Sequence, residues 1–254
     1  MRGNPPLAFD FAQAYVDEKT ARQVSHMRGM RSRQLLEERC GKITPQWMMR
    51  IARDHYEDTF LQGPYFDAAN PDFLSLCMHI SPADFIWGNT ASSCVAVLPK
   101  EAGDLPVFWW TPGPPCNGCY VPFFPHGSKL PEVVSRAGQK GRKVIPADQV
   151  GEDSYSPASY WWLFRQLNDW VKGDPVKSLP GCYAEHNPQV RAKFDELERI
   201  FSAQLPAVVQ NALALKGPNP AEMEKILDDF SASCIAQVLA GLKDLLERFP
   251  AIEE

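Results

Sequence analysis

The chain has 254 residues, 44% hydrophobic and 22% charged, so it can bury a core of ordinary size as a globular protein. Its formal net charge of -5 disfavours nucleic acid as a partner, because phosphate binding requires clustered positive charge. No apolar run approaches the roughly 18 residues that a membrane-spanning helix needs, and residues 1–6 lack the apolar stretch of a signal peptide. We therefore expect a cytoplasmic protein without a membrane span.

The N-terminal region is predicted to be helical. Its basic cluster is interpreted as a solvated helix face rather than a phosphate site, and it consists of His26, Arg28, Arg31 and Arg33. A capping Thr44 followed by Pro45 marks a helix start. Near the end of that helix, Arg53-Asp54-His55 suggests a charge relay, but consecutive helical side chains point about 100° apart. We expect these three residues to form ion pairs on the helix surface.

A β-rich centre is predicted over about residues 72–125, with turns that contain Pro and Gly. The expected strands are Phe73 to His79, Ala91 to Leu98, Val107 to Thr111 and Cys119 to Phe124. Cys94 to Leu98 is apolar without alternation, which predicts a strand covered on both faces. Pro122 lacks an amide hydrogen and is expected at an edge, a bulge or a strand end.

The C-terminal part is predicted to be a helical tail over about residues 156–250. Residues 137–154 are rich in Lys, Gly and Asp and are expected to form an exposed loop. Three further capping residues, each followed by proline, mark helix starts at Ser156-Pro157, Asn187-Pro188 and Asn219-Pro220. The apolar spacing after Pro157 predicts a helix with a large buried face. We expect residues 1–254 to form a single domain of the α+β class.

Seven cysteines are spread along the chain, and the odd number favours reduced thiols over a disulfide framework. Cys116 and Cys119 have the CxxC spacing of redox motifs. Such a motif normally opens a helix, whereas this one lies between Pro114-Pro115 and an aromatic strand, so the context argues against redox chemistry. Zinc requires about four ligands, and only His126 lies near in sequence. We therefore expect no metal and no cofactor.

Five separated motifs in the central part, taken in this order, carry a family resemblance: Leu76-Cys77-Met78-His79, Asn89-Thr90-Ala91-Ser92-Ser93, Phe108-Trp109-Trp110, Pro115-Cys116 and Tyr120-Val121-Pro122-Phe123-Phe124. The chain resembles secernins and related bacterial and protozoan dipeptidases, over roughly residues 5 to 250. The resemblance implies a layered αββα fold, with helices on both outer faces of two packed sheets, as in N-terminal-nucleophile hydrolases. It also implies cysteine-type hydrolysis of dipeptides or small peptides.

In that family the nucleophile is a mature N-terminal cysteine whose own α-amino group acts as the general base. This sequence begins with Met1 and Arg2, and the family's nucleophile segment has no counterpart in it. Cys40 lies between two helical regions rather than at the start of a buried strand, so we expect a structural role for it. The resemblance thus implies a C-terminal portion that is inactive alone, without an assigned catalytic residue.

Two interpretations of the function follow. In the first, the chain completes a dipeptidase together with a separate N-terminal segment, or assembles as a homo-oligomer. In the second, it is a non-catalytic, secernin-like interaction module. Residues that we expect to line a substrate pocket are His79, Asn89, Ser92, Ser93, Cys116 and Asn117.

Each pocket candidate has a plainer alternative. His79 ends a predicted strand before a loop, where side chains often meet ligands, but it can equally be a satisfied core histidine. The Asn89 to Ser93 run offers groups that stabilise an oxyanion, or turn and capping side chains. The resemblance weakens after Cys116, because the family more often has small hydroxyl residues where this chain has Asn117-Gly118-Cys119.

Overall fold

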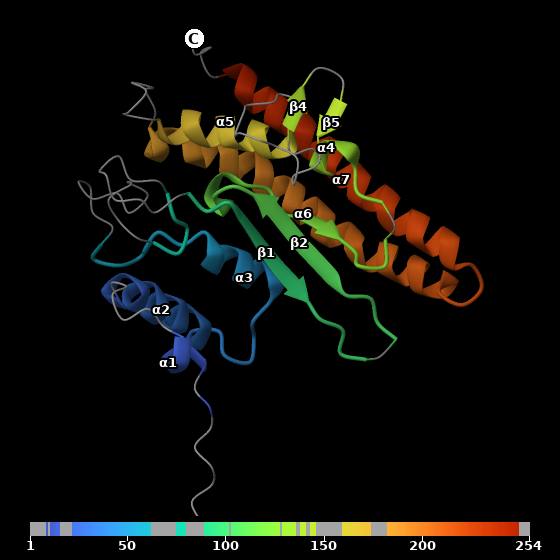
Figure 1. Ribbon diagram of the computed structural model, residues 1–254, viewed down its shortest axis with the longest axis horizontal. Helices are drawn as coiled ribbons and strands as arrows, with labels where there is room; N and C mark the ends of the chain where they lie inside the picture. Colours follow the sequence, from blue (N-terminus) through green and yellow to red (C-terminus); the bar gives the residue numbers. More distant parts are fainter. Residues whose placement is uncertain are drawn as a thin grey trace, which may run out of the picture.

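The structure, a computed structural model, describes residues 9, 11–15, 22–61, 75–79, 89–101, 103–127, 129–135, 138–140, 143–145, 159–173 and 182–248. These residues form seven α-helices, one short 3-10 helix and two small antiparallel sheets (Figure 1). The expected α+β class is confirmed, because the described residues combine helices with small antiparallel sheets. Within the same ranges, no helix is both long enough and apolar enough to cross a membrane.

The main sheet has three antiparallel strands in the order β1-β2-β3: Ser92–Val97, Val107–Pro112 and Val121–Phe123. Three of the four predicted strands are thus confirmed, the last of them shorter than expected. Pro122 lies opposite Trp109 on the edge strand β3, as its missing amide hydrogen requires. The fourth prediction is wrong where it can be checked: residues 75–79 form no strand.

β1 differs from the prediction of a strand covered on both faces. Along Ser92–Val97, exposed residues alternate with half-buried ones, so one face of this strand is open. Leu98, just beyond β1, is 76% exposed, and Phe108, opposite Ala96 on β2, is 36% exposed. The physical reason is position: among the residues that the structure describes, β1 pairs only with β2, at the end of the sheet away from β3.

Three helices precede the sheet: α1 Phe11–Tyr15, α2 Arg22–Glu37 and α3 Pro45–Ala52. The predicted start of α3 is confirmed, because Thr44 Oγ1 accepts a hydrogen bond from the Trp47 amide at 3.2 Å. The buried residue Met49 is on α3, which packs beside β1. The basic cluster on α2 is not wholly solvated as expected, because Arg31 is buried and paired with Asp54.

The C-terminal elements are α4 Glu132–Ser135, β4 Gly138–Lys140, β5 Lys143–Ile145, α5 Tyr160–Lys172, α6 Tyr183–Leu215 and α7 Pro220–Arg248. The β4-β5 pair falls where a continuous loop was expected, so that prediction is wrong at these residues. The start of α7 is confirmed, with Asn219 Oδ1 accepting from the Glu222 amide. Ser156-Pro157 lies outside the described residues.

The predicted helix start at Asn187-Pro188 is wrong. Helix α6 begins earlier, at Tyr183, and includes Pro188 in its first turns. The Asn187 side chain does not cap the helix there, because it donates instead to the Cys116 carbonyl at 2.9 Å.

An apolar core fills the space between the sheet and the C-terminal helices. Helices α6 and α7 lie side by side along their lengths, and both pack against β3 (Figure 1). The predicted buried face of α5 is confirmed, since Tyr160, Phe164 and Leu167 are buried. Phe164 packs its ring 5.7 Å from that of Phe194 on α6. This core fixes β2 and β3, and with them the segment between them that carries Cys116.

Candidate functional site

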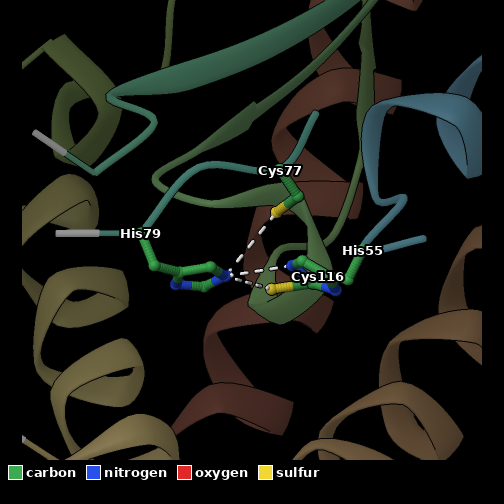
Figure 2. Close-up of side chains that lie close together, drawn as sticks. All are labelled: His55, Cys77, His79 and Cys116. Atoms are coloured by element: carbon green, nitrogen blue, oxygen red, sulfur yellow. Dashed lines mark hydrogen bonds between the residues drawn. The ribbon is translucent and has the colours of Figure 1, made fainter. Parts of the chain in front are cut away.

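Four side chains from three distant segments meet in the interior: His55, Cys77, His79 and Cys116. Each is at most 4% exposed, and one nitrogen or sulfur atom from each lies within 4.8 Å of the others. Figure 2 shows His79 Nε2 facing the other three side chains. It lies 3.1 Å from His55 Nε2, 3.3 Å from Cys116 Sγ and 3.8 Å from Cys77 Sγ. We call these four residues the Cys/His cluster.

His55 reaches the cluster through the turn that follows α3. Tyr56 has φ 65 and Asp58 has φ 60, a left-handed conformation that is strained for residues with side chains, for a bulky tyrosine most of all. The turn is held by Asp54, whose two carboxylate oxygens accept from Arg31 at 2.9 and 2.6 Å. Arg31 also donates to the Glu57 carbonyl. The strained turn therefore directs Asp54 towards α2 and His55 into the cluster.

Cys77 and His79 lie on residues 75–79, whose backbone groups find partners outside any sheet. The Cys77 amide donates to the Asp54 carbonyl at 3.2 Å, and the Thr90 amide donates to the Met78 carbonyl at 2.9 Å. The Thr90 hydroxyl accepts from the Met78 amide in return. This segment thus joins the turn after α3 to the residue run that leads into β1.

Cys116 lies on the 3-10 helix η1, Pro115–Asn117, between β2 and β3. Side chains from two helical regions bind the carbonyls of this segment: Arg53 donates to Pro115, Asn187 to Cys116 and Arg191 to Gly118. A methyl group added at Gly118 would lie 2.2 Å from Thr111 Oγ1. Cys116 is consequently held in a tight, fully bonded loop.

The cluster has unequal proton affinities. Burial opposes ionisation of the Cys116 thiol, but hydrogen bonds and charge from Cys77, His79 and His55 outweigh it and hold its pKa well below the ordinary value. Burial likewise disfavours the His55 cation, yet Cys116 and Glu57 raise its pKa to about 10. Burial lowers the pKa of His79 and raises that of Cys77. The favoured state is a Cys116 thiolate beside a His55 cation.

The outer nitrogen of His55 has two neighbours of its own. His55 Nδ1 lies 3.2 Å from the Tyr183 hydroxyl and 3.4 Å from Glu57 Oε1. Tyr183 comes from the first turn of α6, and burial raises the pKa of its hydroxyl well above the ordinary value. His79 Nδ1 is buried and has no hydrogen-bond partner among the described residues.

The arrangement permits two kinds of chemistry. A thiolate beside an imidazolium is the resting form of many nucleophilic cysteines. Two sulfurs and two imidazole nitrogens at these separations are also a ligand set for zinc. The nearly complete burial of all four side chains distinguishes the two, because a nucleophile needs access to its substrate and a structural metal site does not.

The sequence-predicted pocket residues fall into two groups. His79, Cys116 and Asn117 come together in the interior, where Asn117 is bonded to Asn168 and Asn187. The other three candidates lie at the start of β1, where Asn89 and Ser93 are half-buried and Ser92 is exposed. The Ser93 hydroxyl lies 2.6 Å from that of Tyr120.

Sequence reasoning missed His55 and Cys77 as partners of His79. Arg53, Asp54 and His55 were expected on a helix surface, and this is wrong because α3 ends at Ala52. Each of the three has a separate interior partner: Arg53 pairs with Glu198, Asp54 with Arg31, and His55 joins the Cys/His cluster. The Cys77-x-His79 spacing was a usable signal, but its partners are distant in sequence.

Cys119 does not join Cys116. Its sulfur lies 3.9 Å from the Phe194 carbonyl, and burial raises its pKa well above the ordinary value. All seven cysteines are free thiols. Four are buried, and Cys40, Cys94 and Cys182 are exposed. The exposure of Cys40 argues against the structural role expected for it.

No family model, curated protein or solved structure matches this chain. The resemblance to secernins is therefore an inference from the quoted motifs alone. What the chain does has to be inferred from its residues and their geometry.

Proposed function

We propose that the chain is the C-terminal portion of a cysteine-type dipeptidase related to secernins, and that it supplies substrate-pocket residues and a helical cover rather than the nucleophile. The main support for this proposal is that the five motifs behind the resemblance, although spread over residues 76–124, contact one another in space.

Direct contacts link these motifs. Thr90, in the second, bonds to Met78, in the first. Ser93, also in the second, meets Tyr120, in the fifth. Cys116, in the fourth, contacts His79, in the first. Trp110 and Phe123 pack edge to face and so link the third motif to the fifth. Motifs that form one contact network are expected to serve one site, and this supports an origin in a common functional unit.

The open face of β1 also suits the layered fold that the resemblance implies. Cys94 and Ala96 expose small apolar side chains, with Phe108 beside them on β2. In a layered αββα fold a second sheet would cover such a face.

Substrate contact in this scheme comes from the start of β1. Ser92 is exposed and its hydroxyl can donate to a peptide carbonyl, whereas Asn89 and Ser93 are half-buried, with Nδ2 of Asn89 buried and the Ser93 hydroxyl beside that of Tyr120. His79, Cys116 and Asn117 are buried, and in this scheme they hold in place the loop behind the residues that contact the substrate. The six candidates thus have two roles: three lie where the substrate is contacted, and three support that region.

The test compares two products: the 254-residue chain and the product of the longest reading frame that contains it. Both are incubated with a panel of dipeptides, and released amino acids are measured by mass spectrometry. We expect hydrolysis by the longer product, abolished by thiol alkylation, and none by the chain alone. Ser92→Ala in the longer product should lower kcat/KM by about 100-fold, the effect of losing one oxyanion donor, because Ser92 is the exposed candidate. Ser233→Ala, on the exposed surface of α7, is the control.

Robust turnover by the 254-residue chain would contradict the assignment of the nucleophile to another segment. Failure of both products to hydrolyse or bind any dipeptide would contradict the proposal as a whole.

A second candidate, the non-catalytic interaction module, is favoured by the position of β1, which is an edge strand among the described residues. An edge strand with an apolar face can accept a strand from a partner. The same assay separates the two: a longer product that binds other polypeptides through β1 but hydrolyses nothing would favour the module.

A further inference from the structure

We propose that His55, Cys77, His79 and Cys116 together bind one zinc ion in a closed structural site. This goes beyond the proposed function and does not depend on it, because the ligands, their separations and their burial are properties of the chain itself. No metal was expected from the sequence, because these ligands come from three segments that are far apart along the chain.

The separations between His79 Nε2 and the other three donor atoms are close to those of a tetrahedral site. With zinc–sulfur bonds of about 2.3 Å and zinc–nitrogen bonds of about 2.0 Å, donor atoms lie about 3.3 to 3.8 Å apart. His79 Nε2 lies 3.1, 3.3 and 3.8 Å from the donor atoms of His55, Cys116 and Cys77. All four donors fall within 4.8 Å of one another, so small shifts bring them around one ion.

The charges of the four ligands also favour zinc. Two thiolates balance the charge of one zinc ion, and two neutral imidazoles complete the ligand set, so the bound site is electrically neutral. A neutral site is far less costly to bury than a separated ion pair. Without an ion, four titratable side chains lie close together in the interior, and His79 Nδ1 has no hydrogen-bond partner among the described residues.

The groups that lie next to the outer nitrogen of His55 are of the types that hydrogen-bond to histidine ligands in known metal sites. A histidine that binds metal through one nitrogen commonly hydrogen-bonds through the other to a carboxylate or other acceptor. His55 Nδ1 faces the Glu57 carboxylate and the Tyr183 hydroxyl, which leaves Nε2 free to bind zinc. Glu57 and Tyr183 are thus positioning residues, and Tyr183 connects the site to α6.

The site is structural rather than catalytic. Four protein ligands leave no position for a water molecule or a substrate, and closed tetrahedral sites of two cysteines and two histidines are typical of zinc that stabilises a fold. The ion would join the turn after α3, residues 75–79 and η1, since His79 lies 24 positions after His55 and Cys116 lies 37 positions after His79. Zinc binding therefore contributes to folding free energy.

The first experiment uses the unmodified chain. Protein produced in zinc-supplemented medium is analysed for metal by mass spectrometry, and we expect one zinc per chain. The metal-free protein is then titrated with Co²⁺. We expect one equivalent to give the visible absorption of tetrahedral cobalt and an ultraviolet thiolate-to-cobalt band with the intensity of two thiolates.

The second experiment uses variants. Cys77→Ala and Cys116→Ala should each lose the stoichiometric metal, whereas Cys119→Ala and His126→Gln should keep it, because neither residue belongs to the cluster. Glu57→Gln keeps all four ligands and should weaken Zn²⁺ binding by about 10- to 100-fold, which a chelator competition measures. This variant keeps the test decisive if a ligand variant fails to fold.

Three results would overturn the proposal. The first is a chain without bound metal that gives no thiolate-to-cobalt band on titration. The second is full metal content in a folded Cys77→Ala or Cys116→Ala variant. The third is rapid alkylation of Cys116 in the native protein at equal rates with and without Zn²⁺, which would instead indicate an accessible nucleophile.

Discussion

The interior of this chain has two regions of opposite character. Between the sheet and α5, α6 and α7 it is apolar, with Phe164, Phe194 and Leu227 fully buried or nearly so. Between α2, the turn after α3, residues 75–79 and η1 it is polar, with the Cys/His cluster beside the buried Arg31–Asp54 pair. The first region is stabilised by the burial of apolar surface area, and the second by polar and charged groups that are paired with complementary groups.

The two regions therefore respond differently to mutation. An apolar contact can be reduced gradually, because neighbouring side chains partly refill the space that is lost. A buried polar group that loses its partner bears the full cost of its desolvation. The effect of a substitution on either region can be measured as a change in the free energy of unfolding, by urea titration followed by circular dichroism.

In the apolar region, Phe194→Ala should lower the free energy of unfolding more than any other substitution considered. Phe194 is fully buried on α6 against Phe164, and such a truncation costs about 4 kcal/mol. Phe194→Leu keeps most of the volume and should cost less than half as much. Equal losses for the two variants would contradict the graded response expected of this region.

In the polar region, Asp54→Ala should lower the free energy of unfolding by about 3 kcal/mol, because it leaves the buried Arg31 cation without its carboxylate. The double variant Arg31→Met with Asp54→Leu removes both charges and should cost less than the single variant. Arg33→Ala, which removes an exposed ion pair with Glu37, should leave stability unchanged. A double variant less stable than Asp54→Ala would contradict this account of the pair.

The loop between the two regions should be sensitive to Gly118→Ala. The added methyl group would overlap the Thr111 side chain, and overpacking of this kind costs about 2 kcal/mol. Gly103→Ala is the matched control, since nothing lies within 4 Å of the position that its methyl group would take. A Gly118→Ala variant as stable as the control would mean that this loop is less tightly packed than the structure indicates.

The smallest effect is expected at the start of α3, which carries the turn to His55. Thr44→Ala removes the hydrogen bond to the Trp47 amide and should cost about 1 kcal/mol. Thr44→Ser keeps the accepting oxygen and should restore most of the loss. No difference between alanine and serine would show that the cap does not stabilise the helix.

The contrast also explains which features could be predicted from the sequence. The helix starts at Thr44 and Asn219, the buried face of α5 and the strands β1 to β3 follow from local spacing and capping, and these predictions are confirmed. The burial of β1 was predicted wrongly, because its apolar run indicates cover that these described residues do not provide. Local pattern cannot tell which partner covers a strand.

The polar region follows no local pattern. His55, Cys77 and Cys116 are brought together by a left-handed turn at Tyr56 and by side chains of α6 that hold η1, and neither leaves a periodic signal. His79 and Cys116 were each singled out as pocket candidates, but their contact with one another could not be read from spacing. Long-range pairing of polar groups depends on the complete fold.

Metal binding by the Cys/His cluster can be observed by X-ray absorption at the zinc edge, which identifies the atoms bound to the ion. The protein purified with its metal should show a first shell of two sulfurs at about 2.3 Å and two nitrogens at about 2.0 Å. A first shell of oxygens and nitrogens without sulfur, or a protein that carries no zinc, would contradict it.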